Sequence, residues 1–145
     1  MQKLKTYFQP IMCVILLIIL LALPFVDNDY GYGVSNSFTG FTMAAQTYIG
    51  YLLFLLPILL LSISFSPKYE TAKPKLSLLI PALCIISWLI TVIYAKLFIA
   101  SVADSSLSVG AYSSLICCII LEVYAVLTYR STAKELLESL KNFKK

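Results

Sequence analysis

Hydrophobic positions run in four long stretches, separated by short polar segments. A helix that crosses a bilayer needs about 20 mostly apolar residues. The hydrocarbon offers no water to backbone groups, so a spanning segment must be helical or part of a closed barrel. The runs do not alternate in polarity as barrel strands do. They therefore predict four transmembrane helices, at about residues 8–26, 48–65, 76–100 and 109–129.

Composition strengthens this interpretation. The chain has 145 residues, of which 60% are hydrophobic and 12% charged, and its mean hydropathy is +0.90. A soluble domain is about 45–50% apolar and about 25% charged. We expect an all-α polytopic membrane protein. Its domains are a four-helix transmembrane bundle at residues 1–130 and a cytoplasmic amphipathic tail at 131–145.

Lysine and arginine predict the orientation. Cytoplasmic loops carry an excess of these residues. Ten of the eleven fall in the N-terminal segment, the loop after the second stretch, or the tail, and only Lys96 falls on the other side. The sequence predicts a plasma (inner) membrane protein with both termini in the cytoplasm. This topology accounts for the net charge of +4, so we expect no nucleic-acid partner.

Residues for catalysis or metal binding are scarce. The chain has no histidine, which excludes a Ser-His-Asp set and removes the commonest metal ligand. The four cysteines lie inside apolar runs and form no CxxC motif, so we interpret them as packing residues. We expect no enzyme activity, no metal and no cofactor.

Glu122 is the intramembrane ionisable residue that stands out. It lies eight positions before Arg130, or roughly 12 Å along a helix at 1.5 Å per residue. Ionisable residues at such a depth are costly and usually face the bundle interior. It is either a proton or cation site, or a structural hydrogen-bonding group.

Two features of the stretches concern helix shape and packing. Pro57, in the second stretch, removes a backbone donor and predicts a bend, either a static kink or a gating hinge. Small residues at the start of the fourth stretch permit close helix contact, either within the chain or between copies in a homo-oligomer. These are Gly110, Ala111 and Ser114.

The first outer loop is rich in aromatic residues, and part of it, Val34 to Phe41, is expected to form a short strand or turn. Its aromatic residues suit either an interfacial belt or a recognition surface. They are Tyr30, Tyr32, Phe38 and Phe41.

The tail predicts an amphipathic helix, with capping-box spacing at Thr132 and Glu135. Its apolar face suits either the inner membrane surface or docking to a cytosolic partner. The residues of that face singled out as contacts are Leu136, Leu137, Leu140 and Phe143.

Short motifs carry a family resemblance. They are Leu23-Pro24-Phe25, Ser37-Phe38-Thr39-Gly40-Phe41, the segment from Gly50 to Pro57, and Val109-Gly110-Ala111-Tyr112. Together they resemble small four-span bacterial membrane proteins of unassigned function. In topology alone the chain is similar to bacteriocin immunity proteins and to the membrane subunit of Kiwa-type phage defence. That likeness implies a role in bacterial defence or immunity.

We therefore expect a non-catalytic membrane subunit that senses or binds a partner protein and recruits or regulates it at the membrane. The alternative is a small oligomeric ion channel or proton-linked transporter component that uses Glu122. The sequence leaves open the partner, the oligomeric state and the biological process.

Overall fold

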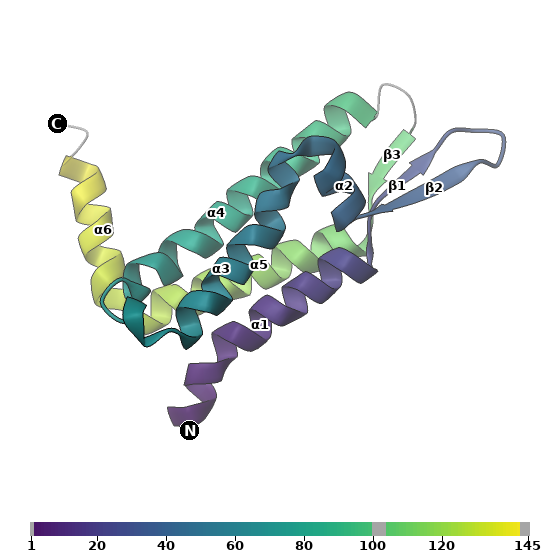
Figure 1. The fold of residues 1–145 in the computed structure, drawn as a ribbon. Helices are drawn as coiled ribbons and strands as arrows, with labels where there is room; N and C mark the ends of the chain where they lie inside the picture. Colours follow the sequence, from purple (N-terminus) through teal and green to yellow (C-terminus); the bar gives the residue numbers. More distant parts are fainter. Residues whose placement is uncertain (1, 100–103, 143–145) are drawn as a thin grey trace.

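The fold is an elongated helical bundle with a small sheet at one end and a separate helix at the other (Figure 1). The computed structural model describes the backbone of residues 2–99 and 104–142, and the side chains of residues 7–97 and 105–139. We call the two ends of the bundle the sheet end and the tail end. Both ends of the described chain lie at the tail end.

Four helices form the bundle, and each contacts two others in the cyclic order α1–α3–α4–α5. Their interior carries most of the buried apolar residues, including Leu16, Leu60 and Leu121. The bundle helices are α1 (Gln2–Ala22), α3 (Leu52–Phe65), α4 (Lys73–Tyr94) and α5 (Val109–Thr128).

Shorter elements connect and extend the bundle. Within the described chain they are α2 (Gly40–Thr47), the 3-10 turns η1 (Ile49–Tyr51) and η2 (Pro67–Tyr69), the π-helical turn η3 (Ala95–Ile99) and the tail helix α6 (Arg130–Asn142). The strands are β1 (Pro24–Asp29), β2 (Ser35–Thr39) and β3 (Asp104–Leu107).

The three strands form one antiparallel sheet in the order β2-β1-β3. The register pairs Val26 with Phe38 of β2 and with Leu107 of β3. Phe25 and Val26 are buried in the core cluster. The sheet is therefore anchored to the bundle through β1.

This sheet corrects two predictions. The fold is mostly helical but not all-α, and the first long helix ends at Ala22, so residues 24–26 of the predicted stretch belong to β1. Pro24 has no backbone donor to continue a helix. Phe25 and Val26 are buried at the base of the sheet. Hydropathy alone does not distinguish a buried strand from the end of a membrane-spanning helix.

The other predicted stretches fit helices with shifted boundaries. The second divides into η1 and α3, while α2 precedes it within the predicted outer loop. The third begins at Lys73 and its predicted end, residue 100, lies outside the described residues. The fourth corresponds to α5, and β2 lies inside the segment expected to form a strand or turn.

Among the residues with described side chains, two helices are long and apolar enough to cross a membrane by length and composition. They are Lys73–Leu97, which joins α4 to part of η3, and Val109–Thr128, which is α5. The apolar helices Tyr7–Ala22 and Ile49–Phe65 are shorter. These lengths indicate membrane association.

Candidate functional site

The sheet end of the bundle interior is closed by a hydrogen-bonded group around the single tryptophan. Trp88 Nε1 donates to the Ala111 carbonyl at 3.0 Å and to Ser114 Oγ at 3.2 Å, and Ser114 Oγ donates to the same carbonyl at 2.9 Å. A Cβ at Gly110 would lie 2.5 Å from the Pro24 carbonyl oxygen. The small-residue face of α5 is thus occupied by α4 and β1 of the same chain.

Three buried cysteines meet near the middle of the bundle. The thiols of Cys84 and Cys118 are in hydrogen-bonding contact, and Cys13 lies close to Cys118. These residues and Cys117 are free thiols. Within the described chain no group of three His, Cys, Asp or Glu side chains is arranged to hold a metal ion. The cysteines fill the interior between α1, α4 and α5.

A polar cluster lies nearer the tail end. Ser77 Oγ, on α4, donates to Gln9 Oε1, on α1, at 3.4 Å. Ser77 is fully buried and Gln9 is 4% exposed. Among the described residues, the Nε2 atom of Gln9 and the Oε2 atom of Glu122 on α5 are both buried and have no hydrogen-bond partner. The sequence singled out Glu122 but missed Gln9 and Ser77.

Pro57 is buried inside α3, which continues on both sides of it. Because proline cannot donate to the carbonyl four residues earlier, the Leu53 carbonyl has no i+4 partner. Pro57 thus interrupts one backbone hydrogen bond of α3 without ending the helix. A role as a hinge stays a prediction.

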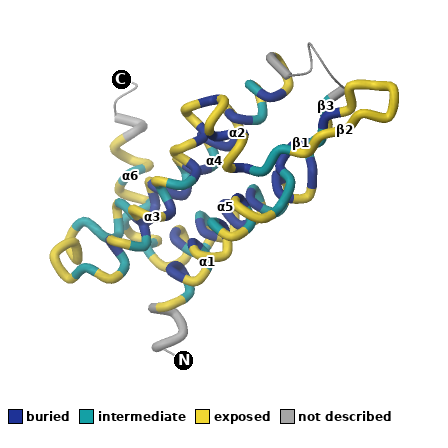
Figure 2. The backbone as a smooth tube through the Cα atoms, turned by 45° about the vertical axis from the view of Figure 1, so that its right-hand side comes forward, coloured by how far each residue is buried: buried dark blue, intermediate teal, exposed yellow. Residues whose placement is uncertain are grey.

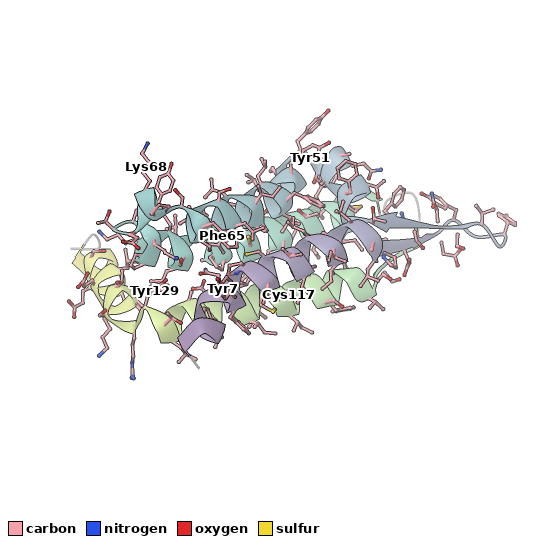
Figure 3. The ribbon with its side chains drawn as sticks, turned by 60° about the horizontal axis from the view of Figure 1, so that its bottom comes forward. Tyr7, Tyr51, Phe65, Lys68, Cys117 and Tyr129 are labelled. Atoms are coloured by element: carbon pink, nitrogen blue, oxygen red, sulfur yellow. The ribbon has the colours of Figure 1, made fainter. Side chains whose placement is uncertain are left out.

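At the sheet end, β1 and β2 form a hairpin that projects beyond the helices (Figure 3). Its tip is closed by hydrogen bonds from Tyr30 N to the Val34 carbonyl at 2.9 Å and from Val34 N to the Gly31 carbonyl at 3.0 Å. Tyr32 lies at the tip with φ +54° and a fully exposed side chain. A non-glycine residue in this left-handed region is uncommon, and it holds an aromatic side chain out in solvent.

The other two outer aromatic residues lie lower on the structure. Phe38 is half-buried against the core cluster. Phe41 lies in α2, where its ring meets those of Tyr51 and Phe54 edge-on, at centroid distances of 6.5 and 5.9 Å. Of the four predicted residues, Tyr30 and Tyr32 therefore lie in the tip, while Phe38 and Phe41 help to attach it.

Asp27 connects the sheet to the start of α5. Hydroxyl hydrogen bonds from Ser108 and, secondarily, Ser37 hold the pKa of its carboxyl below the ordinary value of 3.8, against a smaller opposing effect of burial. Ser108 is the residue that precedes α5, and Ser37 lies opposite Asp27 on β2. The ionised carboxylate therefore links all three elements.

Asn28, one residue further along β1, was not predicted as a site residue. It is 1% exposed, and within the described part of the chain neither its Nδ2 nor its Oδ1 atom has a hydrogen-bond partner. A buried amide without partners is costly, so it weakens this part of β1. The available signal was a polar residue two positions after the buried Val26, on the same face of the strand.

The tail helix α6 leaves the bundle at an angle (Figure 1) and touches the tail ends of α4 and α5. Leu136 is half-buried and Leu137 is 58% exposed. Leu140 belongs to α6, but its side chain and all of Phe143 lie outside the described residues. Of the four residues predicted as contacts, Leu137 is thus available on the surface of α6.

Two apolar grooves run along the outside of the bundle. One, of about 370 Å³, lies between α1 and α3 and includes Tyr7, Pro10 and Phe65. The other, of about 650 Å³, lies beside α3 and includes Leu55, Ser62 and Tyr69. Such grooves suit lipid acyl chains better than a polar ligand, which needs placed polar groups.

Comparisons with protein-family models, with curated proteins and with solved structures gave no match to this chain.

Proposed function

We propose that the protein is a non-catalytic integral membrane protein with four spans, which binds a partner protein outside the cytoplasm through its β1–β2 hairpin. The tail end lies in the cytoplasm, with both termini, and α6 recruits a second protein there. The observation that supports this proposal most is the exposed hairpin tip, where Tyr32 adopts a left-handed backbone conformation.

Apolar side chains on the outer surface of all four bundle helices support four spans. Exposed apolar patches on a soluble monomer rarely exceed a few hundred Å². Here exposed residues of each helix recur along its length (Figure 2), while several polar side chains are buried inside. Examples are Ile11, Ile18 and Leu21 on α1, Leu55, Ile58 and Leu59 on α3, Leu83, Ile86 and Ile93 on α4, and Ile116, Ile119 and Val123 on α5.

The distribution of charge supports the direction of insertion. Among the described side chains, the basic residues of the tail end are Lys68, Lys73, Lys75, Arg130 and Lys134, whereas Lys96 is the basic residue near the sheet end. The sheet end carries Asp27 and Asp29. An excess of positive charge marks the cytoplasmic side, so the hairpin faces outward.

The hairpin has two properties of a recognition element. First, holding a non-glycine residue such as Tyr32 in the left-handed region costs about 1–3 kcal/mol, and such strain concentrates at functional sites. Second, β2 is an edge strand without charged residues or proline, the usual protections against pairing. An extended segment of a partner can add to this edge, and Asp27 and Asp29 on the adjacent strand favour a basic segment.

Photo-crosslinking in living cells tests the hairpin. A photoreactive amino acid at Tyr32 is expected to give a discrete crosslinked band, which mass spectrometry identifies. The same amino acid at Leu55, an exposed position in the middle of α3, is the control and should give no matching band. If position 32 crosslinks nothing under conditions in which the protein is functional, the hairpin is not the binding element.

Recruitment through α6 is tested separately. Leu137→Asp places a charge on an exposed apolar position of α6 and is expected to lose a cytosolic partner in a pull-down. Glu138→Gln, at the next residue, is the matched control and should retain the partner. Equal recovery with both variants would leave α6 as a helix on the membrane surface.

A channel or transporter that uses Glu122 is the second candidate, favoured by its unpartnered oxygen. The packing toward the sheet end argues against conduction through one copy, because Cys13, Leu16, Leu20 and Trp88 fill the interior there. Conduction would need a homo-oligomer. Ion flux in liposomes that is lost in Glu122→Gln would establish this second function over the first.

A further inference from the structure

We propose that Glu122, Gln9 and Ser77 form a binding site for a small hydrated monovalent cation, H₃O⁺ or Na⁺, that is reached from the tail end only. This site is independent of the hairpin and goes beyond partner binding. Its access from the cytoplasm rests on the proposed orientation.

Helix register places the first two residues at the same level along the bundle. Phe8 on α1 and Tyr124 on α5 stack with ring centroids 4.6 Å apart, and Cys13 lies close to Cys118. The helices are antiparallel. Gln9 is four residues before Cys13, and Glu122 is four residues after Cys118, so both lie one turn nearer the tail end on the same helix faces.

The atoms at this level are complementary and unpaired. Gln9 Nε2 is a donor and Glu122 Oε2 is an acceptor, and both are buried without a partner in the protein. Buried polar groups normally have partners. A hydrated cation supplies them, because its water accepts from Nε2 while its positive charge and hydrogens face the carboxylate.

Ser77 adds two oxygen atoms on the third helix. Its hydroxyl already joins Gln9, and its carbonyl lacks the usual i+4 donor because that position is Pro81. Hard monovalent cations are bound by carboxylate, hydroxyl and carbonyl oxygens. In membrane transporters, backbone carbonyls without helical partners coordinate Na⁺ or H⁺ within the bilayer.

The surroundings supply no competing countercharge among the described residues. Lys73, at the start of α4, donates its Nζ to the Ser64 carbonyl at 3.2 Å. Among the described side chains, the other titratable groups on α1, α4 and α5 are Tyr7 and Lys75, which are exposed, Tyr94 and Tyr112 toward the sheet end, Tyr124, which has its own contacts, and the thiols. The α3 segment contains no titratable residue. No described lysine or arginine side chain is paired with Glu122, so we infer that an external cation balances its charge when it is ionised.

Access is one-sided. Toward the sheet end the site is followed by the three cysteine thiols and then by Leu16, Leu20 and Trp88, all buried. Toward the tail end, Arg130 is eight residues from Glu122, roughly 12 Å along the helix. The packed interior closes the site toward the sheet end, so in this proposal the cation loads and empties on the tail side.

The test uses the full chain in lipid nanodiscs, with thermal unfolding followed by the fluorescence of Trp88. Sodium chloride is titrated against choline chloride at constant ionic strength, and pH is varied without sodium. A ligand that binds only the folded state raises the unfolding midpoint. A rise with Na⁺ identifies sodium, and a pH-dependent rise alone identifies the proton.

Either response should be lost in Glu122→Gln and kept in Glu138→Gln, the control on the exposed face of α6. Ser77→Ala should raise the apparent Kd about tenfold or more, as expected for a lost hydrogen bond to a charged group, and it serves alone if Glu122→Gln does not fold. A wild-type midpoint that follows neither Na⁺ nor pH, or responses unchanged in the variants, would overturn the proposal.

Discussion

Gly110, near the start of α5, lies against the backbone of Leu23 and Pro24, where the chain passes from α1 into β1. A Cβ built there would lie 2.5 Å from the Pro24 carbonyl oxygen and 3.0 Å from that of Leu23. Ordinary carbon–oxygen contacts begin at about 3.3 Å, so Gly110→Ala forces the backbones apart by roughly 0.8 Å. Both obstacles are backbone atoms, which cannot turn aside as a side chain can.

Overpacking of this kind typically costs about 1–3 kcal/mol. For a chain of this size each kcal/mol lowers the unfolding midpoint by about 2–4 °C, so we expect a fall of about 2–12 °C. Trp88 is the single tryptophan, and it donates to the carbonyl of Ala111, the next residue after Gly110. Its fluorescence therefore reports unfolding and the local change together.

Val109→Ala is the matched control, because Val109 is 64% exposed and precedes the crowded position directly. Exposed substitutions usually change stability by less than about 0.5 kcal/mol. If Gly110→Ala keeps the wild-type midpoint and emission spectrum, α5 does not approach β1 as described, and the anchoring of the sheet is wrong.

Three further predictions concern the sheet and the bundle. Because the folded-state pKa of Asp27 is depressed, its stabilisation should hold above pH 4 and fade below it; a pH series of unfolding midpoints should flatten in Asp27→Asn, and the effect should stay under about 1 kcal/mol because the carboxylate is largely solvated. Trp88→Phe removes a buried donor and should lower the free energy of unfolding by about 1–2 kcal/mol, measured by thermal unfolding followed by circular dichroism. The cost stays modest because the Ala111 carbonyl keeps its hydrogen bond from Ser114. Unchanged stability would contradict the hydrogen bond from Trp88 to Ala111. Asn28→Val should stabilise the fold by about 1 kcal/mol, because it removes a buried amide without partners; destabilisation would show that the amide is satisfied.

The helices were predictable because their signal is long and uniform. Runs such as 109–129 carry enough apolar residues that a shift of one boundary changes nothing, and α5 lies where expected. The sheet was not predictable in the same way. Phe25 and Val26 extend the first hydrophobic run past Pro24, and the pairing of Val26 with Phe38 and Leu107 depends on residues 12 and 81 positions away.

The polar cluster was predicted in part. A glutamate in a hydrophobic run is conspicuous, so Glu122 could be found from its own surroundings. Gln9 and Ser77 could not, because uncharged polar residues near the end of an apolar run are common, and their meeting depends on how α1, α4 and α5 pack. Helix contacts that are far apart in sequence leave no local trace in a single chain.

Thiol accessibility on intact cells tests the central claim, the four-span layout, most directly. Tyr32→Cys at the hairpin tip and Ser139→Cys on α6 each add an exposed thiol, while the four native cysteines are buried. With a membrane-impermeant maleimide, Tyr32→Cys should be labelled on intact cells and Ser139→Cys only after the membrane is permeabilised. Labelling of Ser139→Cys from outside intact cells, or protection of Tyr32→Cys until permeabilisation, would contradict the layout.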